Sequence, residues 1–192
     1  MERRTTAISF VFFVSAIIIF ILLQEKDMPL RMVDRATGLF AYLFIFLAIL
    51  SSEYMMQMMK IFGTGFITIH HLLARIGISL MVIHPIAFAF EEKSISVFLP
   101  VLYPLKDFLE LAGRPAFYLI LIAVAAAVYR KHIIKKWKNF HYLNYLAFIM
   151  IFMHAWLIGT DLQYTIMKIL WISMALIVFG VFVHKHLINS RS

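Results

Sequence analysis

The sequence predicts an all-α membrane protein, built as a bundle of six transmembrane helices, and three observations support this fold class. Of the 192 residues, 63% are hydrophobic and only 15% are charged, whereas a soluble domain is about half apolar. The mean hydropathy is +0.90. The apolar residues come in blocks long enough to cross a hydrocarbon layer about 30 Å thick. We therefore expect almost all of the chain to lie in or near a bilayer, with no further soluble catalytic domain.

The composition also excludes several kinds of site. The chain contains no cysteine, which excludes disulfides, iron–sulfur clusters, thiolate ligation of haem and covalent haem attachment. The net charge of +8 is concentrated in loops between apolar blocks. This basic excess therefore indicates membrane orientation and not nucleic-acid binding.

Six apolar segments are the expected transmembrane helices: 7–23, 36–59, 66–90, 115–129, 139–159 and 164–183. The first resembles a signal peptide, but polar residues 24–27 stand where a small-residue cleavage site would be. Pro115 suits the first turn of the fourth helix, and Pro85 is expected to distort the third. The connection 91–114 is long enough to form an interfacial element or a lid.

The distribution of Lys and Arg predicts that both termini are cytoplasmic. Ten of the 18 basic residues fall on the side of the termini, seven on the other side, and Arg75 within the third helix. The ten are Arg3, Arg4, Lys60, Arg130, Lys131, Lys135, Lys136, Lys138, Lys185 and Arg191. Short basic loops mark the cytoplasmic face of a plasma or inner membrane.

Two of the expected helices each carry a pair of histidines. His70 and His84 are fourteen residues apart, and His141 and His154 are thirteen apart, so each pair spans about 20 Å at 1.5 Å per residue. Ionisable residues at membrane depth are costly and usually functional. With one span between them, the third and fifth helices run in the same direction. This pairs His70 with His141 near the inner leaflet, and His84 with His154 near the outer leaflet.

Two facing imidazoles can bind the iron of a b-type haem as axial ligands. We expect two haems, although a single haem is an alternative. An iron with both axial positions filled transfers electrons and does not usually bind substrate. Fourteen residues return to within about 40° of the same helix face, but thirteen leave His141 and His154 about 140° apart. Local unwinding or a π-bulge near His141 could bring these two rings to one face.

The remaining candidates have simpler explanations. Arg75 could pair with a haem propionate or snorkel to the cytoplasmic interface, and the sequence leaves both open. His71 is expected to hydrogen-bond across a helix interface. The methionines of segment 55–59 could supply thioether ligands, but flexible packing explains them better. Three further histidines are expected in solvated interfacial positions: His132, His184 and His186.

Two segments resemble the histidine helices of the ferric reductase-like transmembrane domain. These are residues 70–77 (HHLLARIG), followed by His84, and residues 137–145 (WKNFHYLNY), followed by His154. That superfamily includes ferric reductases, NADPH oxidases and the haem-binding subunit of the bacterial methionine sulfoxide reductase system. The resemblance covers about 35–185 and implies a six-helix bundle, b-type haem and electron transfer from inside to outside. The chain departs from it at Ala74, where the family has glycine.

The resemblance divides the chain into three parts. Residues 1–34 are the first helix and its connection, 35–186 the haem-binding domain, and 187–192 a cytoplasmic tail. Without a flavin- or nicotinamide-binding domain after the sixth helix, the donor is expected to be a separate flavoprotein or membrane quinone.

The expected function is therefore a transmembrane electron-transfer subunit of a reductase system, delivering electrons to an external reductase or ferric acceptor. One alternative is a stand-alone ferric or oxygen reductase. Another is a haem-free transporter or channel that uses the histidines as a relay.

Overall fold

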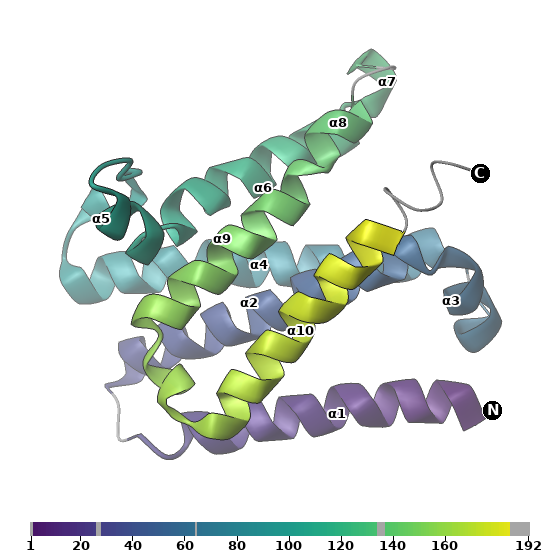
Figure 1. The fold of residues 1–192 in the computed structure, drawn as a ribbon, viewed down its shortest axis with the longest axis horizontal. Helices are drawn as coiled ribbons and strands as arrows, with labels where there is room; N and C mark the ends of the chain where they lie inside the picture. The colour runs from purple at the N-terminus through teal and green to yellow at the C-terminus, as the bar shows by residue number, and fades with distance from the viewer. Residues whose placement is uncertain (1, 26–27, 64, 134–136, 185–192) are drawn as a thin grey trace. The chain divides into compact units, whose positions relative to one another are not determined.

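A computed structural model describes residues 2–25, 28–63, 65–133 and 137–184, and all regular secondary structure in this part of the chain is helical (Figure 1). Five segments are long and apolar enough to cross a membrane. They are α1 (Glu2–Leu22), α2 (Pro29–Glu53), α4 (Phe66–Glu92), α8 (Trp137–His141) running on into α9 (Leu143–Ile158), and α10 (Thr165–Val183). The predicted all-α class is thus confirmed, with five candidate membrane spans.

The predicted fourth span forms a shorter helix. This helix, α6 (Gly113–Val128), is apolar but has only 16 residues, which extend over about 24 Å at 1.5 Å per residue. It falls short of a typical hydrocarbon core by about one turn.

The second predicted helix has different limits in the structure. It begins at Pro29, earlier than expected, because a proline at the first helical position has a suitable φ and needs no hydrogen bond from its nitrogen. It ends at Tyr54, whose φ of −108° and ψ of 43° are not helical, and α3 (Met55–Phe62) follows. The connection 91–114 also contains helices, namely η1 (Ile95–Phe98) and α5 (Leu105–Glu110), and α7 (Arg130–Ile133) lies in the basic connection.

The chain divides into two compact units. Unit 1 consists of Met1–Glu91 and Tyr164–Ser192, and unit 2 of Glu92–Gln163. The boundary predicted after residue 34 falls inside α2. The predicted tail 187–192 lies outside the described residues, as do His186 and four of the basic residues used for the orientation: Lys135, Lys136, Lys185 and Arg191.

Helix α2 provides the centre of unit 1. Its side chains Tyr42, Leu43 and Phe46 are at most 2% exposed, and the Tyr42 ring stacks on Trp171 of α10 with 4.2 Å between ring centroids. A Cβ atom on Gly77 would lie 3.2 Å from the backbone nitrogen of Ile45. This glycine therefore lets α4 approach the backbone of α2 closely, as small residues do between membrane helices.

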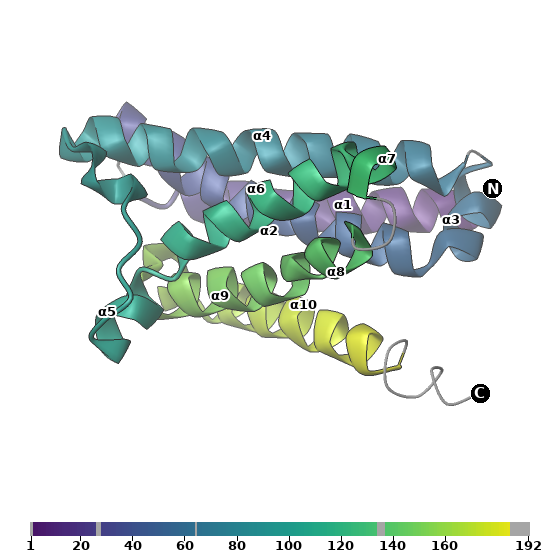
Figure 2. The ribbon, with the colours of Figure 1, turned by 90° about the horizontal axis from the view of Figure 1, so that it is seen from above.

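Unit 2 is an antiparallel helical hairpin. Helix α6 runs alongside α8 and α9 (Figures 1 and 2), and its inward residues are small: Ala116 and Ala123 are fully buried. The connection before α6 is fixed to it by Arg114, whose guanidinium donates to the carbonyl oxygens of Ser96 and Leu99 at 3.1 and 3.2 Å. The unit closes with η2 (Thr160–Gln163).

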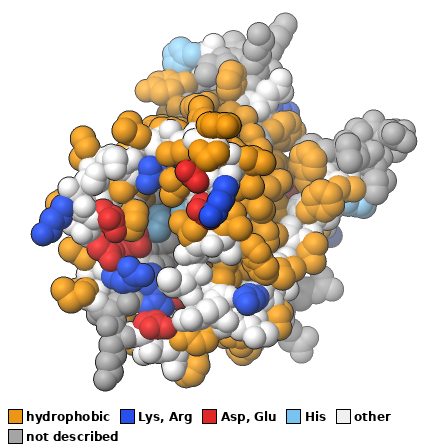
Figure 3. Space-filling view, turned by 60° about the vertical axis from the view of Figure 1, so that its left-hand side comes forward, with side chains coloured by type: hydrophobic (Ala, Val, Ile, Leu, Met, Phe, Trp, Pro, Cys, Tyr) orange, Lys and Arg blue, Asp and Glu red, His pale blue; other side chains and the backbone are white. Residues whose placement is uncertain are grey.

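Both units expose large hydrophobic side chains. Phe12 and Phe90 of unit 1 are 72% and 68% exposed, and Val128 of unit 2 is 70% exposed. Hydrophobic side chains occupy much of the face drawn in Figure 3. In water such extensive apolar exposure would favour aggregation or partner binding. On helices of this length it is compatible with contact between the helices and lipid.

Candidate functional site

The two histidines of α4 both hydrogen-bond to the backbone of α2. Nδ1 of His70 donates to the carbonyl oxygen of Ala48 at 3.0 Å, and Nδ1 of His84 donates to that of Asp34, also at 3.0 Å. The histidines are fourteen residues apart, and so are their acceptors, in the opposite chain direction. Both rings therefore lie on the α2 side of α4, as the fourteen-residue spacing predicts.

The two histidines of unit 2 also face main-chain carbonyls. Nδ1 of His154 donates to the carbonyl oxygen of Glu110 at 2.7 Å, and Nδ1 of His141 lies 3.4 Å from that of Ala123. Thirteen residues separate the histidines, and thirteen separate the acceptors. The rings thus lie on one side of α8 and α9. His154 faces Glu110, just before α6, and His141 faces Ala123 within α6.

A helix break explains how a thirteen-residue spacing can place two rings on one side. Helix α8 ends at His141, and α9 begins at Leu143. Between them the amide of Tyr145 bonds to the carbonyl of Tyr142, a tight turn spanning three residues. This is the hydrogen bonding of a 3₁₀ helix, which has about 3.0 residues per turn where an α-helix has 3.6. The side chains before the turn therefore point in a different direction relative to those of α9. Of the two irregularities that could reorient His141, local unwinding or a π-bulge, the structure has a break of the helix at Tyr142.

These hydrogen bonds determine the chemistry that the four rings can perform. A carbonyl oxygen only accepts, so Nδ1 of His70, His84 and His154 must carry the hydrogen. Nδ1 of His141 lies 3.4 Å from the carbonyl oxygen of Ala123 and also 3.4 Å from Nδ2 of Asn144, an amide that can donate. Where Nδ1 of a neutral imidazole carries the hydrogen, the lone pair is on Nε2, the other ring nitrogen. Metal-binding histidines commonly have this arrangement, in which one ring nitrogen donates to a carbonyl or carboxylate and the other can bind the metal. The donor set fits axial ligation of haem iron.

Two glycines lie directly against two of these rings. A Cβ on Gly113 would lie 2.9 Å from Cδ2 of His154, and a Cβ on Gly38 would lie 3.0 Å from Nδ1 of His84. Real Cβ atoms almost never come closer than 3.0 Å to another heavy atom. Both rings therefore occupy space that a side chain at the glycine position would fill, and the two glycines allow the rings to adopt these positions.

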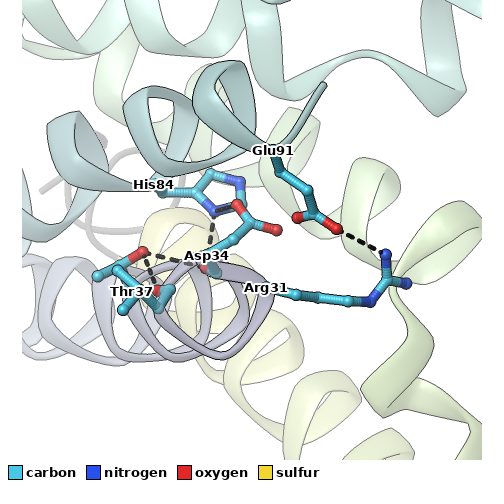
Figure 4. Close-up of polar contacts among 6 residues, drawn as sticks. Arg31, Asp34, Thr37, His84 and Glu91 are labelled. Carbon is cyan, nitrogen blue, oxygen red and sulfur yellow. Dashed lines mark hydrogen bonds and ion pairs between the residues drawn. The ribbon is translucent and has the colours of Figure 1, made fainter. Parts of the chain in front are cut away.

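A polar cluster surrounds His84 at the end of α4 (Figure 4). The carboxylate oxygen Oδ1 of Asp34 lies 2.8 Å from Nδ1 of His84, and the Thr37 hydroxyl donates to the carbonyl oxygen of Asp34 at 3.0 Å. Beside them Arg31 pairs with Glu91 at 3.2 Å, which joins the start of α2 to the end of α4. The sequence analysis did not identify Asp34, Gly38 or Gly113. Only the presence of a carboxylate at the start of an apolar helix could have pointed to the first.

The other candidates lie elsewhere on their helices. His71 and Arg75 are both exposed, and Nε of Arg75 donates to the carbonyl oxygen of His71 at 3.1 Å. The propionate and snorkelling interpretations of Arg75 both stay predictions. His132 and His184 are exposed, in keeping with solvated positions. In the part of the chain that the structure describes, no three His, Cys, Asp or Glu residues converge on a possible metal-ion site, but axial ligation of a haem iron requires only two imidazoles.

Each predicted ligand pair takes one histidine from each unit, so the pairing of His70 with His141 and of His84 with His154 stays a prediction. Comparisons of the chain with protein-family models, with curated proteins and with solved structures found no match. Any functional conclusion therefore has to be drawn from the residues and their geometry.

Proposed function

We propose that this chain is a transmembrane b-type haem electron-transfer protein. It would carry electrons from a cytoplasmic flavoprotein or membrane quinone to an acceptor outside, as one subunit of a reductase system. The observation that carries the proposal is the shared setting of His70, His84, His141 and His154. All four are half-buried in apolar helices, and each directs Nδ1 at a main-chain carbonyl.

In the proposed function the protein's contribution is to hold the imidazoles still. At His70, His84 and His154 the carbonyl fixes the tautomer and orientation of the ring, which favours binding of a metal through Nε2. Two imidazoles would fill both axial positions of the haem iron, and the haem would then supply one-electron transfer. Placing the histidines at two levels about 20 Å apart along each helix would give the electron a path across the bilayer.

The topology of each unit supports six membrane crossings. In unit 2, the acceptors Glu110, just before α6, and Ala123, within α6, match the thirteen-residue spacing of His154 and His141. Helix α6 thus runs antiparallel to α8 and α9 and would cross with them despite its length. In unit 1, the hydroxyl of Tyr164, just before α10, donates to Glu25, just after α1, at 3.2 Å. The end of α1 thus lies beside the start of α10. This favours both termini being on one side, which the Lys and Arg distribution assigns to the cytoplasm.

The experiment is to purify the protein from haem-replete cells and measure its haem-to-protein ratio and Soret absorbance. Alanine variants of the four histidines would each lose about half of the bound haem, because one missing axial ligand removes one site. His71→Ala and His132→Ala are matched controls and should keep all of it.

The pairing is tested in the same series. His84→Ala and His154→Ala should lose the same haem, and His70→Ala and His141→Ala the other, as judged by the absorbance and potential of the haem that remains. Protein without a Soret band would refute the proposal and would favour the haem-free relay.

A further inference from the structure

The setting of His84 differs from that of the other three histidines. His70, His141 and His154 each direct Nδ1 at a main-chain carbonyl oxygen. His84 directs Nδ1 at two oxygens of one residue, the carbonyl oxygen of Asp34 at 3.0 Å and its carboxylate Oδ1 at 2.8 Å (Figure 4). The carboxylate is the closer of the two, and it adds a charged acceptor to the neutral one.

The structure holds this carboxylate in place against the ring. Asp34 Oδ1 is buried and, in the described part of the chain, makes no hydrogen bond, so Nδ1 of His84, 2.8 Å away, is an ion-pair contact with it. Gly38, one turn further along α2, gives the ring room beside Asp34, since a Cβ there would lie 3.0 Å from Nδ1. The Arg31–Glu91 ion pair ties together the two helix ends that carry Asp34 and His84. The contact is therefore built by several residues and does not depend on one mobile side chain.

A carboxylate beside Nδ1 changes the ligand that the ring can provide. The Nδ1–H hydrogen bond goes to the carbonyl oxygen of Asp34, and the negative charge of the carboxylate lies 2.8 Å from the same nitrogen. This charge increases electron density on the imidazole and hence the basicity of Nε2. A more electron-rich axial ligand stabilises ferric over ferrous haem iron. Hydrogen bonding to the axial ligand is one of the ways by which proteins adjust haem potentials.

We infer that Asp34 is a positioning residue that lowers the reduction potential of the haem bound by His84 and so makes the two haems inequivalent. This inference rests on the proposed function, because it presupposes that His84 binds haem. The haem near the outer surface would be the one whose reduction potential is lowered. It would therefore be a stronger reductant toward the external acceptor than a haem whose histidines are bonded only to carbonyls.

The test is a redox titration of the purified protein, followed by optical absorbance, in wild type and in Asp34→Asn. Asparagine keeps the shape and the main-chain carbonyl but removes the charge. We expect both haems to be retained, one midpoint potential to move upward and the other to stay where it is. Thr37→Val is the matched control, since it removes a hydrogen bond to the same carbonyl and leaves the carboxylate. It should move neither potential.

The outcomes separate the inference from the proposed function. Wild-type protein without haem would refute the proposed function. Haem retained in Asp34→Asn with both potentials unchanged, or with both moved equally, would refute the inference alone. If Asp34→Asn loses the haem bound by His84, Asp34→Glu distinguishes a role of the carboxylate from a structural role of Asp34. Haem retained there at the wild-type potential supports a role for the carboxylate, and loss in both variants shows that Asp34 is merely structural.

Discussion

Two antiparallel helix pairs carry the histidines, and we call them the two hairpins: α2 with α4 in unit 1, and α6 with α8 and α9 in unit 2. They place two histidine rings on one side of a helix in different ways. In unit 1 a continuous helix of 27 residues, α4, carries His70 and His84 fourteen residues apart. In unit 2 the spacing is thirteen, and the chain breaks at Tyr142 between α8 and α9. In both, the acceptors on the facing segment keep the same spacing as the histidines. Helical periodicity keeps the two rings of unit 1 on one side, whereas the rings of unit 2 need the helix break, and in both units the acceptors match the spacing of the histidines.

The hairpins also differ in what holds the rings. The α4 hairpin uses main-chain carbonyls together with the Asp34 carboxylate. The second hairpin uses carbonyls at 2.7 and 3.4 Å, the longer one at His141 beside the helix break. We therefore expect the His141 ring to be the least firmly oriented of the four, since hydrogen bonds weaken with distance.

Changing the register should have the largest effect. One alanine inserted between Gly77 and Ile78 rotates His70 relative to His84 by about 100° and makes their spacing fifteen. The two rings can then no longer both meet acceptors fourteen residues apart, so the haem-to-protein ratio should fall by about half or more. An alanine inserted between Gly159 and Thr160 alters neither spacing and is the control. Equal haem content in the two insertions would show that register is unimportant.

Filling the space beside the rings should have an intermediate effect, and it compares the hairpins directly. Gly113→Ala places a Cβ 2.9 Å from Cδ2 of His154, whereas Gly38→Ala places one 3.0 Å from Nδ1 of His84. We expect partial loss of haem in both and more in Gly113→Ala. Gly180→Ala is the matched control, because no atom lies within 4 Å of the Cβ position there. Haem content measured by absorbance checks the order, and full retention in Gly113→Ala would contradict it.

The smallest effect is expected at Ser51. Its hydroxyl lies 3.4 Å from Nδ1 of His70 and donates to the carbonyl of Ala48 at 2.7 Å, the same carbonyl that His70 uses. Ser51→Ala removes one buried hydrogen bond, which costs about 1 kcal/mol of stability. The His70–Ala48 bond remains, so the haem content should not change, while thermal unfolding occurs at a slightly lower temperature. Loss of haem in this variant would mean that the carbonyl alone does not hold the ring.

The sequence predicted what depends on local composition. Apolar blocks located every long helix, and the spacing of His70 and His84 placed both rings on one side of their helix. It also showed that His141 and His154 could share one side only with a local irregularity near His141, and the helix breaks at Tyr142. These features follow from residues close together in the chain, where helical periodicity is sufficient.

The sequence did not predict what depends on the register between helices. Nothing near His84 in the sequence indicates Asp34, fifty residues earlier, and nothing near His154 indicates Gly113. Their roles arise only when α2 lies against α4, and α6 against α9. The early start of α2 at Pro29 was also missed, because the polar residues before position 36 obscured the helix boundary.

The central claim is that histidines of both hairpins bind haem iron in pairs, and electron paramagnetic resonance of the oxidised, purified protein tests it most directly. We expect low-spin ferric signals typical of ligation by two imidazoles, with one signal lost in His84→Ala and the other in His70→Ala. Haem-loaded protein that shows only high-spin iron, or the same low-spin signals in all four histidine variants, would contradict it.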